Sequence, residues 1–264
     1  MQPSRWCYVA RPPTASLLKV FVCVLAAGLG FFGAGFRAIA DEPPMPLARV
    51  AERVGAHEPL RIVAFGSSST QGIGATSPAA TYPAKLESLL TDALPESEVT
   101  VINRGIGGQD AEEFHARVGQ VLADAPDLVI FQTGTNALLR HLPLARFVAL
   151  TREDIATFQA HGIDVILLEQ QYCPVFAKAA GAFDYVTALR RIGEEMRVPV
   201  IRRWDLMKDW LARHEATLAD LESPDGLHMA DKGYAMLARA ARNAILAHAG
   251  IPLPPKVPVI SASR

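Results

Sequence analysis

The stretch Arg61-Ile62-Val63-Ala64-Phe65-Gly66-Ser67-Ser68-Ser69 decides the fold class of this 264-residue chain. An apolar run of β-branched and aromatic residues ends in a glycine and three serines, which is typical of a buried strand that passes into a polar turn. A strand that is apolar almost throughout needs helices covering both of its faces. We therefore expect residues 61–65 to form an inner strand of a parallel sheet, with the three serines at its carboxyl end.

The same pattern recurs along the chain. Further short apolar runs predict strands at Val99–Ile102, Leu128–Gln132, Val165–Leu168 and Val198–Arg202. Stretches with helical periodicity lie between or after them, at Tyr82–Leu94, Ala111–Ala123, Leu144–Ala160, Tyr185–Arg197 and Lys232–Ala247. This alternation predicts an α/β fold, a doubly wound open parallel sheet of the flavodoxin-like three-layer α/β/α type, in a single domain over residues 61–248.

The two ends of the chain differ from this domain. Residues 1–40 contain four basic and no acidic side chains, an uncharged apolar run at residues 20–36, and Ala38-Ile39-Ala40. These features predict a signal peptide cut after Ala40 and a secreted or periplasmic protein, with no stable membrane insertion after cleavage. The alternative is a membrane anchor at residues 20–36, although this run is shorter than the ~20 apolar residues that span a bilayer. We expect residues 41–60, with a helical stretch at Leu47–Val54, to be a leader, and residues 249–264 an extended tail.

Composition excludes several classes of protein. With 50% hydrophobic residues, 20% charged residues and 3 cysteines, the chain is not a disordered, collagen-like or disulfide-stapled protein. A net charge of −1 gives no global field that would recruit nucleic acid or an anionic membrane. Cys173 is the one cysteine outside the signal peptide, and we expect it to be a small buried hydrophobe rather than a nucleophile. No histidine or cysteine cluster has zinc-ligand spacing, and no nucleotide-binding glycine motif follows the first strand, so we expect neither metal nor organic cofactor.

Ligands bind at the carboxyl ends of the strands in sheets of this kind. The first strand ends in Ser67–Ser69, which suits a nucleophilic serine, a hydroxyl-rich turn that holds phosphate, or a structural turn. The second ends in Asn103-Arg104-Gly105-Ile106-Gly107-Gly108, whose glycines allow close approach to a ligand or an ordinary tight turn. The third ends in Gly134-Thr135-Asn136, where the amide can donate to an oxygen with developing charge or cap the next helix.

A fourth segment, Asp225-Gly226-Leu227-His228, precedes the last predicted helix. This spacing allows Asp225 to hold the imidazole at Nδ1 and to leave Nε2 free as a base. Of the seven histidines, His228 alone has a carboxylate three residues before it across a glycine. His115, His161, His214 and His248 are expected to be solvated on or near helices, and His57 and His141 to lie in loops.

Taken together and in this order, the four segments resemble the SGNH hydrolases, the GDSL esterase/lipase superfamily. The resemblance implies that Ser68 is the nucleophile, that Asp225 and His228 serve it, and that the Ser68 backbone N–H, Gly108 and Asn136 form the oxyanion hole. Two positions depart from the family pattern. Ser67 stands where an aspartate usually precedes the nucleophile, and Ala137 where an aspartate commonly follows the asparagine.

The resemblance implies a serine hydrolase that cleaves carboxylic esters, including short-chain or carbohydrate O-acyl groups, through an acyl-serine intermediate. Its partner would be a small-molecule or glycan ester. The loop from Glu169 to Phe176 could line the pocket, its polar half toward a sugar and Val175 and Phe176 toward a short acyl chain. The alternatives are an acyltransferase or carbohydrate-binding protein on the same fold, and a flavodoxin-like phosphate or nucleotide binder.

Overall fold

The computed structural model describes residues 46–254, so the predicted signal peptide, residues 1–40, lies outside the described residues. Five parallel strands form one sheet in the order β2-β1-β3-β4-β5. Their bounds are Leu60–Gly66 (β1), Val99–Gly105 (β2), Leu128–Gln132 (β3), Asp164–Leu168 (β4) and Val200–Ile201 (β5). This is the flavodoxin-like strand order, and it confirms the predicted doubly wound α/β fold.

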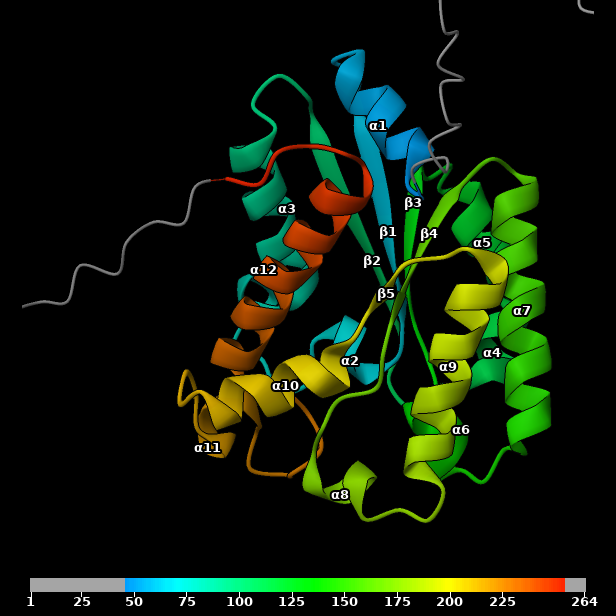
Figure 1. Ribbon diagram of the computed structural model, residues 1–264, viewed down its shortest axis with the longest axis vertical. Helices are drawn as coiled ribbons and strands as arrows, with labels where there is room; N and C mark the ends of the chain where they lie inside the picture. Colours follow the sequence, from blue (N-terminus) through cyan, green and yellow to red (C-terminus); the bar gives the residue numbers. More distant parts are fainter. Residues whose placement is uncertain (1–45, 255–264) are drawn as a thin grey trace, which may run out of the picture. The chain divides into compact units, whose positions relative to one another are not determined.

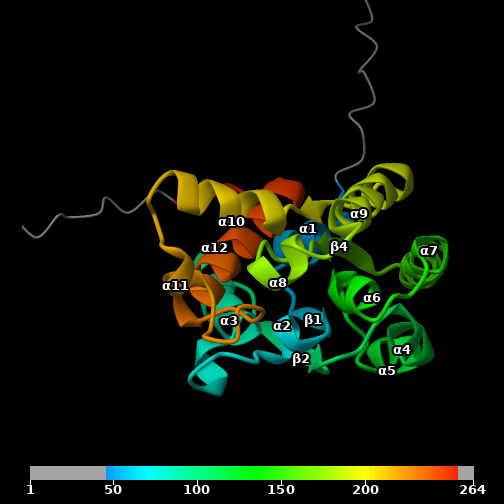
Figure 2. The same ribbon diagram turned by 90° about the horizontal axis from the view of Figure 1, so that it is seen from below.

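Helices cover both faces of the sheet (Figure 1). One face carries α1 (Ala48–Gly55), α3 (Tyr82–Ala93), α10 (Arg203–Ala212) and α12 (Asp231–His248). The other face carries α4 (Ala111–Ala116), α5 (Val118–Ala123), α7 (Leu144–Ala160) and α9 (Ala182–Met196). Three short helices follow the carboxyl ends of β1, β3 and β4 and appear at the near end in Figure 2, namely α2 (Ser68–Gln71), α6 (Thr135–Leu139) and α8 (Pro174–Ala177). The remaining short elements are η1 (Pro78–Ala80) and α11 (Leu218–Leu221).

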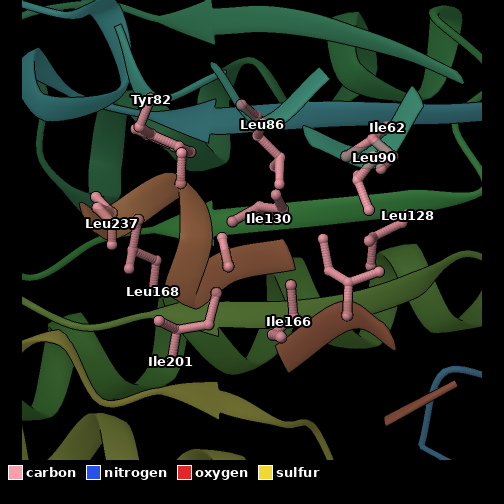
Figure 3. Close-up of a cluster of buried hydrophobic side chains, with 14 of the residues drawn as sticks. Ile62, Tyr82, Leu86, Leu90, Leu128, Ile130, Ile166, Leu168, Ile201 and Leu237 are labelled. Atoms are coloured by element: carbon pink, nitrogen blue, oxygen red, sulfur yellow. The ribbon is translucent and has the colours of Figure 1, made fainter. Parts of the chain in front are cut away.

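The core lies in two layers because successive strand residues point to opposite faces. In β1, Ile62 packs into the cluster under α3 and α12, and Val63 packs into the cluster under α4, α7 and α9. Figure 3 shows the first of these clusters, where side chains of β1, β3, β4 and β5 meet those of α3 and α12. Complete burial of one such aliphatic side chain is worth about 1.5–3 kcal/mol.

The predicted helix over Ala111–Ala123 is wrong in one respect, because it divides into α4 and α5 at Arg117. The backbone of Arg117 leaves the helical region at φ −121° and ψ 15°. Its side chain instead turns inward, where Nη2 donates to the Gly66 carbonyl at 3.0 Å and Nε donates to Gln109 Oε1 at 2.6 Å. These two hydrogen bonds accompany the break in the helix, which the apolar periodicity of the sequence did not indicate. The last strand is also shorter than predicted, since it includes only Val200 and Ile201.

Residues 47–55 belong to the domain, although the sequence suggested a leader there. Leu47 and Val50 are completely buried in the cluster under α3 and α12. Asp127 Oδ1 accepts hydrogen bonds from Arg53 Nε at 2.8 Å and Arg49 Nε at 3.1 Å, which ties α1 to the start of β3. At the other end of the domain, Ala249 is buried, so the predicted tail begins only after it. Within residues 46–254, no helix is both long enough and apolar enough to cross a membrane.

Candidate active site

The serine turn begins where β1 ends and α2 begins. Ser67 is the N-cap of α2 and Ser68 its first residue. Ser68 is 9% exposed, whereas Ser67 and Ser69 are 3% and 1% exposed. The sharp strand-to-helix turn therefore presents Ser68 more openly than either of its serine neighbours.

Gln132, the last residue of β3, forms hydrogen bonds to this turn. Its Oε1 accepts hydrogen bonds from the Ser67 backbone N–H at 2.9 Å and from Thr70 Oγ1 at 3.1 Å. Its Nε2 donates to Ser67 Oγ at 3.2 Å. The Ser67 hydroxyl is therefore occupied, while no hydrogen bond to the Ser68 hydroxyl occurs among the described residues.

The glycine segment after β2 lies against the serine turn. A Cβ on Gly105 would stand 2.0 Å from the backbone nitrogen of Gln71, so a side chain there has no room. The Gly107 N–H donates to Gln71 Oε1 at 2.7 Å, and a Cβ on Gly107 would stand 3.7 Å from the Ser68 Cβ. Gly108 follows with φ +79°, a backbone conformation that favours glycine. Within residues 46–254 its N–H has no acceptor, so it can donate to a ligand beside Ser68.

Asn136 lies beside the same segment. The Nδ2 of Asn136, in α6, donates one hydrogen bond to the Gln109 carbonyl at 2.8 Å. Because an amide nitrogen carries two hydrogens, this bond orients the side chain and leaves one donor over. Ala137, at the position that departs from the family pattern, is completely buried.

His228 and Asp225 are in hydrogen-bond contact. His228 Nδ1 lies 2.6 Å from Asp225 Oδ2, and the His228 side chain is 16% exposed. Burial alone would raise the pKa of Asp225, but hydrogen bonds from His228, Leu227 and Ser223 hold it well below the usual range. The carboxylate therefore stays ionised, and the ring nitrogen Nε2 has no hydrogen-bond partner in the part of the chain that the structure describes.

The turn after α2 contacts both the serine and the histidine. The Ile73 N–H donates to the Ser68 carbonyl at 3.0 Å. A Cβ on the next residue, Gly74, would stand 3.3 Å from the His228 Cβ. Tyr234 Oη of α12 donates to the Ile73 carbonyl at 2.7 Å and fixes this turn. Ser68 and His228 therefore flank one turn at the carboxyl edge of the sheet, with Gly108 and Asn136 alongside.

Sequence reasoning missed the buried polar residues that support this edge. Arg117 joins the serine strand to Gln109, and burial lowers the pKa of its guanidinium to about 10. Gln171 and Arg203 lie behind the His228 segment, with exposed fractions of 2% and 0%. For Gln132 alone the sequence offered a signal, since it is the one polar residue in an otherwise apolar predicted strand, Leu128–Gln132.

Two expectations are wrong. The polar half of the loop after β4 does not line a pocket, because Glu169, Gln170 and Gln171 are buried, and Glu169 pairs with Arg190. Phe176 is buried too, against Trp204, although Val175 is 42% exposed.

His115 is exposed as expected, and its Nδ1 also lies 2.7 Å from Asp154 Oδ1, which joins α4 to α7. Cys173 is buried and free as predicted, and burial raises its pKa. Among residues 46–254, no group of three or more His, Cys, Asp and Glu side chains could hold a metal ion.

The non-GDSL lipase-like family matches residues 37–251, which is most of the chain. The chain belongs to this family. The family name agrees with the sequence of the serine turn, since Gly66-Ser67-Ser68-Ser69 stands in place of a Gly-Asp-Ser-Leu motif. An arylesterase from Vibrio mimicus is 26% identical over 164 residues, which are 61% of this chain and 78% of the relative. Membership of this lipase-like family assigns the chain to the hydrolases that act on ester bonds.

Solved structures share the fold. A two-domain esterase (CEX) active on acetylated mannans superposes with a TM-score of 0.64 and 21% identity over 83% of this chain. This chain spans only 58% of the length of that two-domain protein. The acetylxylan esterase Axe2 from Geobacillus stearothermophilus, of the same 21% identity, superposes with a TM-score of 0.59 over 73% of this chain and 95% of its own. At this level of identity the likeness concerns the fold alone.

Proposed function

We propose that this non-GDSL lipase-like protein is a serine esterase that removes short acyl groups through an acyl-serine intermediate. The observation that carries the proposal is the Asp225–His228 pair beside the turn that presents Ser68. A serine hydroxyl is a weak nucleophile at neutral pH and needs a base as its bond to carbon forms. An imidazole oriented at Nδ1 by an ionised carboxylate, with Nε2 unoccupied, is suited to that role.

In the first half of the proposed reaction, Ser68 Oγ attacks the ester carbonyl and His228 Nε2 takes the hydroxyl proton. The tetrahedral intermediate then collapses, and His228 passes the proton to the leaving alcohol. In the second half, water attacks the acyl-serine, His228 takes a proton from the water, and the acid leaves as the Ser68 hydroxyl re-forms. Asp225 keeps the tautomer and stabilises the imidazolium in both halves.

The negative charge that develops on the carbonyl oxygen needs donors that are already in place. The backbone N–H groups of Ser68 and Gly108 and the second amide hydrogen of Asn136 are the proposed donors. Loss of one such donor typically costs ~2.7–4 kcal/mol of barrier. Gly108 suits this role because its positive φ turns the backbone, and its Cα has open space around it.

The surroundings of Ser68 favour a small acyl group. Ile73 and Ile106, on the turns after α2 and β2, are 39% and 44% exposed, and we expect them to form an apolar rim beside Ser68. Such a rim shelters a methyl or short alkyl group, while the alcohol part of the ester remains in solvent. The arylesterase relative and the two fold neighbours that act on acetylated glycans make acetyl esters of phenols and of sugars the substrates to test first.

A panel of nitrophenyl esters from acetyl to palmitoyl tests this proposal on wild type and on Ser68→Ala. We expect turnover to be highest for acetyl or butyryl and to fall for long chains, and Ser68→Ala to lose activity by orders of magnitude. Acetylated xylan and mannan oligosaccharides then replace the aryl esters, with released acetate as the readout. Equal activity of wild type and Ser68→Ala on every ester would contradict the proposal.

Export is part of the proposal and rests on residues 1–40 of the sequence. A protein cut after Ala40 would begin at Asp41 in the periplasm or outside the cell. Mass spectrometry of the exported protein tests this directly. Retention of residues 20–36 on a membrane-bound form would establish the anchor instead.

A further inference from the structure

Arg203 is a buried cation without a carboxylate partner. It is the first residue of α10, its side chain is 0% exposed, and it forms no ion pair within residues 46–254. Burial lowers the pKa of its guanidinium to about 10, so the group is still charged at neutral pH. Removing a charge from water costs several kcal/mol unless other groups compensate. The groups that receive hydrogen bonds from Arg203 therefore indicate what the arginine does at this position.

The hydrogen bonds of Arg203 lead to the histidine segment. Its Nε donates to the Glu169 carbonyl at 2.8 Å, and its Nη2 donates to Gln171 Oε1 at 2.8 Å. Its Nη1 lies 3.8 Å from the sulfur of Met229, the residue after His228. One side of the guanidinium group thus contacts the loop after β4, and the other contacts the segment that carries the proposed base.

Gln171 completes this connection. Its Oε1 also accepts from Thr135 Oγ1 at 3.1 Å, so two donors fix which way the amide points. Its Nε2 is thereby directed to the Leu227 carbonyl, to which it donates at 3.1 Å. Leu227 immediately precedes His228, and Thr135 immediately precedes Asn136. A single amide therefore bonds to both segments that supply the proposed base and oxyanion donor.

We propose that Arg203 is a positioning residue, which acts through Gln171 and Met229 to hold the backbone on both sides of His228 in register with Ser68. This inference rests on the proposed function, because it assigns a role in the same reaction. The exposed Asp225 fixes the rotation of the imidazole, and the Arg203–Gln171 pair fixes where the imidazole stands. A displacement of about 1 Å can reduce the rate of such a reaction by about 10²-fold.

The test compares Arg203→Met and Gln171→Leu with a matched control, Arg190→Met. Arg190 also bonds to Glu169, the residue after β4, but within residues 46–254 it has no hydrogen bond or ion pair to the segment that carries His228. We expect kcat on nitrophenyl acetate to fall about 10- to 100-fold in Arg203→Met and Gln171→Leu, with KM changed little. Arg203→Lys should recover part of the loss, and Arg190→Met should keep kcat within about threefold of wild type.

Two further measurements separate positioning from a merely structural role. The hydrogen-bonded Nδ1 proton of His228, observed by NMR, should broaden or shift in Arg203→Met and stay unchanged in Arg190→Met. The double variant should lose little more activity than either single variant, because both changes break one connection. If Arg203→Met does not fold, Gln171→Leu and the NMR signal decide.

The inference is overturned if folded Arg203→Met and Gln171→Leu keep wild-type kcat and an unchanged His228 signal. Ser68→Ala, measured in the same assay, distinguishes this failure from that of the proposed function. If Ser68→Ala is inactive while Arg203→Met is fully active, only the positioning role is wrong. If Ser68→Ala is as active as wild type, the proposed function is wrong as well.

Discussion

The geometry of Asn136 fits two roles, a tether between two loops and a donor to the oxyanion. One amide hydrogen is bound to the Gln109 carbonyl at 2.8 Å, and the other is the proposed oxyanion donor. An asparagine that only tethered two loops would contribute to stability and not to catalysis. The two roles therefore differ in what its removal does to the rate.

We expect Asn136→Ala to lower kcat by about 10²–10³-fold on nitrophenyl acetate, because a donor to the developing oxyanion is lost. KM should change little, since the uncharged ester carbonyl of the ground state benefits less from the bond. Asn243→Ala, on the remote part of α12, is the control and should behave as wild type. A folded Asn136→Ala with unchanged kcat would make the asparagine a tether only.

At this scale the sequence predicted the residues with local signals and missed those without. Asp225 and His228 stand three positions apart, and Ser68 stands in an unusual run of serines, so each is visible locally. Gln132 bonds to a residue 65 positions away, and Arg203 to one 32 positions away. Such contacts exist only once the strands are side by side, and no short motif predicts them.

At the scale of elements, the segment from Glu222 to Met229 carries a buried acid next to the proposed site. Glu222 pairs with Met229 in an antiparallel bridge and is 7% exposed, and its Oε1 has no partner within the described residues. Burial, with the nearby charge of Asp225, raises the pKa of Glu222 to about 7. Because the pKa of Glu222 is higher in the folded than in the unfolded protein, its contribution to the free energy of unfolding is fully present below about pH 4. This contribution is lost as the pH rises through 7.

Glu222→Gln should therefore raise the urea midpoint of unfolding at pH 8, since glutamine imitates the protonated acid. At pH 4 the variant and wild type should unfold at nearly the same urea concentration, because Glu222 is then mostly protonated in both the folded and the unfolded wild type. Urea titrations at the two pH values, followed by circular dichroism, make the comparison. A variant that is less stable than wild type at pH 8 would show that the ionised form of Glu222 is the stabilising one.

Helix α1 gives a second prediction for an element, because the sequence suggested that it lay outside the domain. Leu47 is 0% exposed, so Leu47→Ala should lower the free energy of unfolding by about 2–5 kcal/mol. Leu253→Ala, at a leucine that is 51% exposed, should have almost no effect. Chemical denaturation of the two variants beside wild type measures both. Equal stability of the three proteins would mean that residues 47–55 do not stabilise the domain, as expected for a leader.

Apolar periodicity predicted a helix well where one face of the helix is buried, as in α7, whose bounds Leu144–Ala160 are those expected. It failed where a polar contact competes with the pattern, as at Arg117, or where an edge strand is short, as in β5. Helix α10 was not predicted. It begins with Arg203 and Trp204, both buried, and a buried arginine does not fit the pattern of apolar residues on one helical face.

For the whole molecule, topology explains why separate segments form one site. In a parallel sheet all carboxyl ends lie at one edge, so the loops after β1, β2 and β3 meet there. Helix α12 packs against α3, and Tyr234 in its first turn bonds to the Ile73 carbonyl, so the Asp225–His228 segment just before it reaches the same edge. The family match over residues 37–251 includes all four segments and α1. The fold thus makes a serine, a histidine and two donors neighbours.

The central claim is that Ser68, and neither Ser67 nor Ser69, is the nucleophile. Labelling with a fluorophosphonate tests it most directly, because the serine oxygen bonds to phosphorus and fluoride leaves only at an activated serine. We predict one label per chain, on Ser68 within the tryptic peptide from Ile62 to Lys85, which is retained in Ser67→Ala and Ser69→Ala and absent from Ser68→Ala. A label that persists in Ser68→Ala, or that maps to Ser67 or Ser69, would contradict the account.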